Sequence, residues 1–366
     1  MSSSKPTYLQ IFDEVKKNIR NRNLSPGDML PTDNELAERY GVSRPTVAKA
    51  LGLLSKEKLI IRRPGFGTQV LAPGKSDLTV GLLMPHMHET EIFEPICSSI
   101  TETANLDGMQ IVHPSELNLR NDSRAIAEAL TQKFIDLKVH GVFFTPVEHL
   151  DDHQEEFNLS ILERLHEAGI RVVLIDRDVY PWPRRTPYDL IGIDNIEAGY
   201  VMTNHLIQNG CRNLAFVTEG NPAMTVQQRI IGSREAHVQN GLRARDLSMM
   251  ECDLRAQEQV AKQLIESKID GVMCANDATA APLLRALLNL GVEIPKDMKV
   301  CGIDDVKYAS LLSIPLSSYH QPCKDLGKIA AKTMMDRILS PDRPPHRVTL
   351  SGDIMVRSSS CIEESR

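Results

Sequence analysis

The strongest constraint on this chain lies in residues 33–70, where two short helical patterns and a hairpin pattern follow one another. The first helical pattern ends at Tyr40, and the second begins at Arg44 after a tight glycine turn. We expect Ser43 to cap the second helix, with Pro45 in its first turn, where a missing N–H costs nothing. Two helices joined by so short a link predict a helix-turn-helix.

The second helical pattern has an apolar and a polar face. The apolar positions recur at helical spacing and are expected to face the core: Val47, Ala50, Leu51 and Leu54. The polar face presents two cations and a hydroxyl near the N-terminal end of the helix, a combination that suits the major groove of DNA. We therefore predict DNA contacts by Ser43, Arg44, Thr46 and Lys49.

A hairpin pattern follows this helix. The segments LIIRR and TQV predict two strands, and PGFG predicts the turn between them. Arg62 and Arg63 lie on the first strand, while Gly65 in the turn lets the backbone approach phosphates closely. The stretch thus predicts the wing of a winged helix-turn-helix, with DNA contacts by these three residues.

Charge is distributed unevenly along the chain. Residues 1–75 hold 13 Lys and Arg against 7 Asp and Glu, a net charge of +6. The whole chain has a net charge of −6, so residues 76–366 carry a net charge of −12. A basic head on an acidic body fits a protein that touches nucleic acid with one end only. Residues 6–22 predict a bracing first helix, and phosphate contacts by its Lys16 and Lys17 are an alternative role.

Several classes of protein are excluded by composition and pattern. Seven cysteines without a CxxC pair predict neither a disulfide framework nor a zinc site, and favour a reducing cytoplasm. The N-terminal segment carries acids, unlike a signal peptide, and no uninterrupted apolar run of about 18 residues predicts a membrane span. His86 and His88 have no third ligand at a fixed spacing, which favours a loop over a metal site. No metal or cofactor is therefore expected.

No enzymatic activity is expected. A nucleophile elbow, HExxH, Walker A and GxGxxG are all missing from the sequence. Asp304 and Asp305 are adjacent in a predicted strand, so their side chains point oppositely and do not share a substrate.

From Thr79 onward, short apolar runs alternate with helical patterns. The predicted strands are TVGLLMP, QIVHP, GVFFTP, RVVLID, NLAFVT, DGVMCA and KVCGID. Such alternation predicts an α/β fold with parallel sheets covered on both faces, and about ten strands favour two sheets over one.

Polar residues follow three of these runs and the segment SSY, at strand ends where ligands bind in open parallel sheets. They are Asp176-Arg177, Asn276-Asp277, Asp304-Asp305 and His320-Gln321. Together they predict a pocket for a small hydroxylated or anionic molecule. Each of these residues alone also has a purely structural explanation. An Asp or Asn after a strand commonly caps a helix, and Arg177 has acidic neighbours to pair with. The segment around Trp182 either packs a loop or stacks over a ligand.

Residues 24–70 resemble the DNA-binding domain of the GntR family. The matching motifs are PGDMLP, GVSRPTVAKAL and RRPGFGTQV, in the order in which the family carries them. The resemblance implies a DNA-binding regulator. Asn34 and Ala48 stand where many members carry arginines that contact DNA, and Phe66 replaces a common polar wing residue, so the operator sequence does not carry over.

Residues 79–358 resemble the effector domain of the LacI/GalR family, which is related to periplasmic sugar-binding proteins. The matching motifs include VVLIDRD, IGIDNIEAGYVMTNHLIQNGCRNLAFV, CANDATAAPLLRALLNLGVEIPKDMKVCGIDD and IPLSSYHQP. The resemblance implies two lobes joined by three crossings, with an effector in the cleft. The residues it implies as effector contacts are Phe93, stacking on a sugar ring, with Asp176, Arg177, Asn195, Arg229, Asn276, Asp304 and Gln321.

The expected domains follow from these two resemblances. We expect a winged helix-turn-helix over 1–71, a linker over 72–78, an effector domain over 79–358 and a tail over 359–366. Lobe 1 is expected over about 79–188 and 322–348, and lobe 2 over about 189–321 and 349–358. A hinge helix of the LacI type is missing, and the combination resembles regulators of the arabinose-repressor type.

These observations predict a cytoplasmic transcription regulator, in the form of a repressor, that binds double-stranded operator DNA as a homodimer. Its effector is expected to be a sugar or a sugar phosphate. One alternative is a solute-binding protein that uses the same cleft without gene regulation, and the basic head opposes it. A fusion to an aminotransferase-like domain is a second alternative, but 366 residues leave too little room for it.

Overall fold

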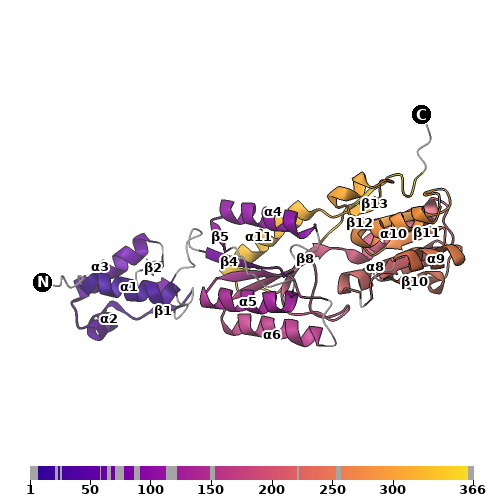
Figure 1. Ribbon diagram of the computed structural model, residues 1–366. Helices are drawn as coiled ribbons and strands as arrows, with labels where there is room; N and C mark the ends of the chain where they lie inside the picture. The colour runs from indigo at the N-terminus through magenta and orange to yellow at the C-terminus, as the bar shows by residue number, and fades with distance from the viewer. Residues whose placement is uncertain are drawn as a thin grey trace.

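A computed structural model describes residues 7–20, 24, 27–57, 59–63, 67–70, 78–85, 91–112, 122–148, 153–220, 222–252 and 257–361. Figure 1 shows three parts in a row: a small domain at the N-terminal end, then two α/β lobes.

The N-terminal domain contains three helices, and the predicted helix-turn-helix is present. They are α1 (Thr7–Arg20), α2 (Asp33–Tyr40) and α3 (Arg44–Lys56). A reciprocal capping box begins α2: the Thr32 hydroxyl accepts from the Glu35 N–H, and the Glu35 carboxylate accepts from the Thr32 N–H at 2.7 Å. Gly41 ends α2 at φ 61°, a left-handed conformation that glycine adopts without strain.

The core of this domain lies between α1, α2 and α3. Val47, Ala50, Leu51 and Leu54 are fully buried, as their helical spacing predicts, and they pack with Ile11 of α1. Ser43 is the N-cap residue of α3, but its side chain caps no backbone N–H. Its hydroxyl instead lies 2.8 Å from the Thr46 hydroxyl, so the expected capping bond is absent at this residue.

The hairpin pairs β2 (Ile60–Arg63) with β3 (Gly67–Val70) in antiparallel register. A two-residue strand that the sequence pattern does not reveal, β1 (Met29–Leu30), pairs with the other edge of β3. The PGFG turn lies outside the described residues, Gly67 excepted.

Lobe 1 holds a six-stranded sheet in the order β14-β8-β7-β6-β4-β5, and every pair in it is parallel. Its strands are β4 (Leu78–Leu83), β5 (Met109–Val112), β6 (Gly141–Phe144), β7 (Arg171–Ile175), β8 (Asp189–Ile193) and β14 (Arg347–Leu350). Its helices are α4 (Phe93–Leu106), α5 (Ser123–Asp136), α6 (Gln154–Glu167) and α11 (Cys323–Leu339). Helices α4 and α11 cover one face and α5 and α6 the other (Figure 1).

Lobe 2 holds a second six-stranded sheet in the order β10-β9-β11-β12-β13-β15, parallel except for the edge pair β13 and β15. Its strands are β9 (Leu214–Thr218), β10 (Ser248–Glu251), β11 (Gly271–Cys274), β12 (Lys299–Asp304), β13 (Ser317–His320) and β15 (Asp353–Met355). Its helices are α7 (Asn195–Gln208), α8 (Met224–Gln239), α9 (Gln257–Glu266) and α10 (Asp277–Asn289), with short 3-10 turns at Ala244–Asp246 and Lys307–Leu311. The expected α/β fold with two parallel sheets is confirmed.

The lobe boundaries differ from those expected. Strand β8 pairs with β7, and β14 pairs with β8, so both strands belong to lobe 1. The first crossing therefore follows Ile193 rather than residue 188, and the third follows Leu350 rather than residue 348. The effector domain begins one residue earlier than expected, because Leu78 already begins β4.

The expected tail is also too long. Ser359 and Ser360 are fully buried, and the Val300 N–H donates to the Ser359 carbonyl at 2.9 Å. The Ser359 N–H donates in turn to the Pro315 carbonyl at 3.0 Å, so the effector domain continues beyond residue 358.

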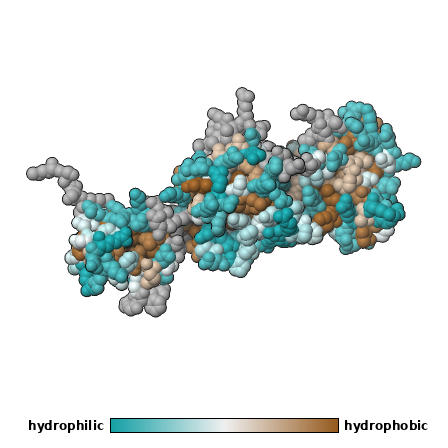
Figure 2. All heavy atoms as spheres, turned by 90° about the horizontal axis from the view of Figure 1, so that it is seen from below, coloured by the Kyte–Doolittle hydropathy of each residue, from teal (hydrophilic) through white to brown (hydrophobic). Residues whose placement is uncertain are grey.

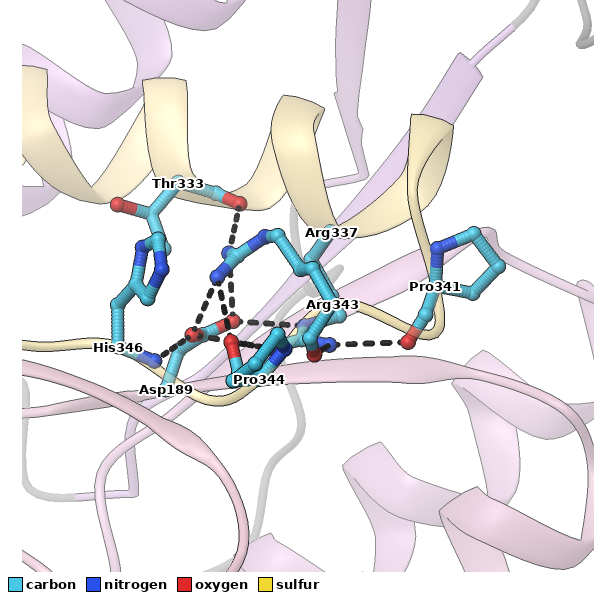
Figure 3. Close-up of polar contacts among 7 residues, drawn as sticks. All are labelled: Asp189, Thr333, Arg337, Pro341, Arg343, Pro344 and His346. Carbon is cyan, nitrogen blue, oxygen red and sulfur yellow. Dashed lines mark hydrogen bonds and ion pairs between the residues drawn. The ribbon is translucent and has the colours of Figure 1, made fainter.

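The buried Asp189, at the start of β8, accepts hydrogen bonds from two arginines and a backbone N–H of lobe 1 (Figure 3). The Asp189 carboxylate accepts from Arg337 of α11 at 2.8 Å, from Arg343 at 2.9 Å and from the His346 N–H at 2.6 Å. Burial alone would raise the pKa of the Asp189 carboxyl, but these donors outweigh burial and hold the pKa below its usual range. We call these four residues the Asp189 cluster; they join β8 to α11 and to the segment that leads into β14.

The visible face in Figure 2 is mainly hydrophilic, with hydrophobic side chains exposed at separate places on all three parts. Scattered exposed apolar residues of this kind are ordinary for a folded protein surface. Within the described residues, no helix has the length and apolar character needed to cross a bilayer.

Candidate functional site

The first candidate site is the N-terminal end of α3. Ser43, Arg44 and Lys49 are exposed there, and Thr46 is half-buried. The Lys49 ammonium lies 4.1 Å from the centroid of the Tyr8 ring, so an aromatic contact from α1 holds its position. The structure thus brings these four predicted DNA contacts together at the N-terminal end of α3.

The structure describes two of the three wing residues that the sequence predicts to contact DNA. Arg62 is exposed on β2, and its guanidinium donates to both carboxylate oxygens of Asp33, at 2.8 and 2.6 Å. This pair ties the wing to the start of α2. Arg63 also lies in β2, and Gly65 lies outside the described residues.

The second candidate site is a cavity of about 110 Å³ between the lobes, at the carboxyl ends of both sheets. We call it the inner cavity. Its polar lining comes from Glu148, Asp176, Arg177, Thr218, Glu219, Thr225, Arg229, Asn276, Thr279 and Asp304, and its apolar lining from Ile92, Phe93, Pro222, Ala223, Val226 and Ala275. Six of the eight predicted effector contacts therefore meet in one cavity. His86 and His88 lie outside the described residues.

Two buried carboxylates line this cavity, and both have raised pKa values. Asp176 follows β7 and Asp304 ends β12, and both adopt left-handed backbone conformations, with φ 70° and 116°. Burial raises the pKa of Asp176 to about 6, against the nearby charge of Arg229, and Asp304 adds to the rise. Burial also raises the pKa of Asp304, while Arg229 and the Gln321 amide oppose the rise. Backbone strain of this kind commonly persists at ligand sites.

Arg229 is held rigidly at the back of the inner cavity. Its Nε donates to the Asn195 side-chain oxygen at 2.9 Å, and its terminal nitrogens donate to the Ala275 carbonyl at 2.6 Å and lie 3.8 Å from Asp304. The sequence places Arg229 near a helix start, where an arginine is commonly solvated, but it is almost fully buried. Its partners from three separate elements offset the desolvation of its charge.

Two glycines let α7 and α8 approach closely at this point. A Cβ on Gly199 would lie 2.0 Å from the Arg229 carbonyl oxygen, and a Cβ on Gly232 would lie 1.9 Å from the Ile196 carbonyl oxygen. The backbones of the two helices are therefore in contact, and this contact sets the depth of Arg229 in the cavity.

Arg177 bridges acids on lobe 1. Its guanidinium pairs with Glu148, which follows β6, and its Nε lies 3.3 Å from Asp176. Its guanidinium carbon lies 5.9 Å from the centroid of the buried Phe93 ring. The alternative in which Arg177 pairs with an acidic neighbour is thus partly realised, and the arginine still lines the cavity.

Asn195 and Gln321 do not line the inner cavity but orient residues that do. Asn195 positions Arg229, and the Gln321 amide donates to Asp304 at 2.7 Å. Asn276 lines the cavity and also caps α10, because its side-chain oxygen accepts from the Thr279 N–H at 2.8 Å. For Asn276 the capping role and the lining role therefore coexist.

Sequence reasoning missed several lining residues. Thr218 ends β9, Glu219 follows it, and Glu148 lies in the segment after β6, so all three carry the strand-end signal that singled out Asp176 and Asp304. The strand-end rule would have found these three. Thr225 and Thr279 lie in the first turns of α8 and α10, where threonine has no distinctive pattern.

Two family models match the chain in separate regions. Residues 7–70 match the model described as bacterial regulatory proteins, gntR family. Residues 203–360 match the model described as a periplasmic binding protein-like domain. This chain is a transcriptional regulator with a gntR-family DNA-binding domain and a periplasmic binding protein-like domain.

The regulator is similar over almost its whole length to an arabinose metabolism transcriptional repressor from Geobacillus stearothermophilus, at 24% identity. The alignment covers 98% of this chain and 97% of that protein. The similarity to a repressor therefore extends over both the DNA-binding region and the effector region of this chain.

Solved structures resemble the effector domain. A LacI family regulator from Enterococcus faecium with bound ribose superimposes with a TM-score of 0.62 at 23% identity, covering 77% of this chain and 98% of that one. The transcriptional regulator CelR in complex with cellobiose superimposes with a TM-score of 0.63 at 24% identity, covering 90% of this chain and 100% of that one. These similarities confirm the fold of the two lobes.

Proposed function

We propose that the regulator is a repressor whose operator affinity is set by a small neutral sugar bound in the inner cavity. The observation that carries this proposal is one cavity in which buried acids and arginines from both lobes converge, joined to a helix-turn-helix with an exposed basic end. A molecule that bridges both lobes changes their relative position only if it binds one arrangement better than the other. Two structural relatives bind ribose and cellobiose, which supports a sugar.

Charge in the inner cavity favours a neutral effector over a phosphorylated one. Four carboxylates line it, from Glu148, Asp176, Glu219 and Asp304, against two guanidinium groups. Arg177 already pairs with acids, and Arg229 lies beside Asp304. Sugar hydroxyls donate to carboxylates and accept from guanidinium groups, so a neutral polyol satisfies both, whereas a phosphate would add a like charge to an acidic cavity.

We further propose that two copies of the chain bind a two-fold symmetric operator, since closed two-fold dimers are the commonest assembly. Ser43, Arg44, Thr46 and Lys49 would enter the major groove from α3, while Arg62, Arg63 and Gly65 of the wing approach the backbone. Effector binding would then alter the spacing of the two heads, with a coupling free energy of about 1–3 kcal/mol. Such a protein acts in the cytoplasm, where operator DNA lies, and needs no catalytic step.

The test is fluorescence anisotropy of labelled DNA from upstream of the gene, with and without a panel of pentoses, hexoses and disaccharides. Arg44→Ala should weaken DNA binding about 5- to 150-fold, because a charged contact to a base edge is worth about 1–3 kcal/mol. Arg229→Ala should leave DNA affinity unchanged and abolish the response to the sugar. Each variant is compared with wild type by circular dichroism to verify folding.

Arg285→Ala is the matched control, because Arg285 is an exposed arginine on α10 of the same lobe as Arg229. It should leave both DNA binding and the sugar response intact. The proposal fails if folded Arg44→Ala binds DNA like wild type, or if no sugar shifts DNA affinity while wild type binds a sugar by calorimetry.

A further inference from the structure

A second cavity adjoins the inner cavity beyond Arg177. Its volume is about 350 Å³, and Asp176, Arg177 and Thr225 line both cavities. Its other walls come from the loop after β7, from β8 and β14, and from the first residues of α7 and α8. We call it the outer chamber. It is the larger of the two, and the proposed function assigns no ligand to it.

One wall of the outer chamber is aromatic and cationic. Tyr180, Trp182, Arg184 and Arg185 all come from the loop between β7 and β8. The Arg184 guanidinium carbon lies 4.0 Å from the centroid of the Tyr180 ring. Trp182, the only tryptophan of the chain, is 48% exposed. An exposed aromatic, a guanidinium stacked on a tyrosine ring and a second arginine in the same loop form a surface that recognises planar or anionic groups.

The carboxylates of the outer chamber are already engaged. Asp178 pairs with Arg347 and accepts from the Thr186 N–H at 3.2 Å. Asp194 caps α7, accepting from two backbone N–H groups at 3.0 Å. Asp176 lies beside Arg177. None of these acids is therefore left over to neutralise a further cation.

Two arginines of the chamber have weak or no acidic partners. Arg184 lies 3.4 Å from Glu155, and both side chains are largely exposed, so the pair contributes little. Arg185 is exposed, and the structure records no ion pair for it with any described residue. Adding these two guanidinium groups leaves the outer chamber with a cationic excess, opposite to the acidic inner cavity.

We propose that the outer chamber is a subsite for a phosphoryl group of a small metabolite, bound by Arg184 and Arg185 beside Trp182. Planar guanidinium forks match the oxygens of a phosphate bidentately and keep their charge at every physiological pH. The phosphoryl group belongs either to a separate molecule or to a sugar that reaches from the inner cavity into the outer chamber. In the second case the preference for a neutral ligand applies only to the part of the ligand inside the inner cavity. The inference goes beyond the proposed function, because an anion binds here whether or not DNA affinity responds to a neutral sugar.

The single tryptophan makes the test direct. Full-length protein is titrated with inorganic phosphate while Trp182 fluorescence and calorimetric heat are followed in parallel. We expect saturable binding, and we expect Arg185→Ala to weaken it about tenfold, because hydrogen bonds to charged groups are the strong ones. Arg285→Ala on lobe 2 is the matched control and should bind phosphate like wild type.

Further titrations identify the source of the phosphoryl group. If it belongs to the sugar, a pentose or hexose monophosphate binds more tightly than phosphate and competes with both phosphate and the neutral sugar. If it belongs to a separate molecule, phosphate binds equally well when the neutral sugar is saturating. The inference is overturned if neither probe detects saturable phosphate binding, or if Arg185→Ala and Arg285→Ala bind it alike. A failure of DNA to respond to a neutral sugar would overturn only the proposed function.

Discussion

The Asp189 cluster offers a quantitative test of what holds lobe 1 together. In Asp189→Asn, two guanidinium groups lose a fully buried carboxylate that accepts from both of them (Figure 3). Breaking a buried ion pair by removing one partner costs about 3–5 kcal/mol. The guanidinium groups keep carbonyl partners, since Arg337 also donates to Pro341 at 2.9 Å and Arg343 to Thr333 at 3.3 Å. We therefore expect the lower end, about 3 kcal/mol.

The assay is thermal and urea unfolding followed by circular dichroism. A loss of about 3 kcal/mol corresponds to a Tm lower by roughly 6–12 °C, at about 2–4 °C per kcal/mol for a domain of this size class. Asp325→Asn is the control, because Asp325 forms an exposed pair with Lys328 on the same α11 and such pairs are worth at most about 1 kcal/mol. If both variants unfold at the same temperature, the buried network does not stabilise lobe 1 as argued.

The Asp189 cluster also predicts how stability falls at low pH. The folded pKa of Asp189 is lowered, so its contribution is fully present above the unfolded pKa of about 3.9 and is lost as pH falls through the folded value. Asp189→Asn should therefore lose less stability than wild type when the pH is lowered below about 4. An equally steep acid limb in both proteins would contradict the assignment.

Three further results are expected. Gly232→Ala should separate α7 from α8 and cost about 1–3 kcal/mol, measured by urea unfolding, and should weaken sugar binding because Arg229 moves; unchanged binding would contradict the close-approach argument. Effector affinity, measured by calorimetry across pH, should fall as pH drops below about 6, because protonated Asp176 accepts fewer hydroxyl donors. An affinity that does not change with pH would show that the Asp176 carboxylate does not contact the effector. Leu54→Ala should destabilise the DNA-binding domain by about 2–5 kcal/mol, since Leu54 is fully buried, and equilibrium unfolding should show that loss in the N-terminal domain alone.

Local patterns in the sequence account for the elements. The apolar spacing of Val47, Leu51 and Leu54 predicts α3 because a helix repeats every 3.6 residues, and the glycine turn before it needs a conformation that Gly41 adopts freely. The alternation of apolar runs and helical patterns predicts two parallel sheets. Carboxyl ends of parallel strands meet at one edge, so Asp176 and Asp304 could be expected in one cleft before any contact was known.

Contacts between distant segments decided the rest. Strand β8 carries a buried Asp189 at its start, and it lies in lobe 1 because it pairs with β7 on one edge and with β14, far along the chain, on the other. Which acids pair with Arg177 and Arg229, and which arginines stay open in the outer chamber, follows from three-dimensional proximity that no spacing encodes. The sequence by itself determined most of the helices and the longer strands, and which strand ends carry polar side chains, because these depend on neighbouring residues. The tertiary structure alone decided the charge of each cavity, because it brings together side chains from both lobes.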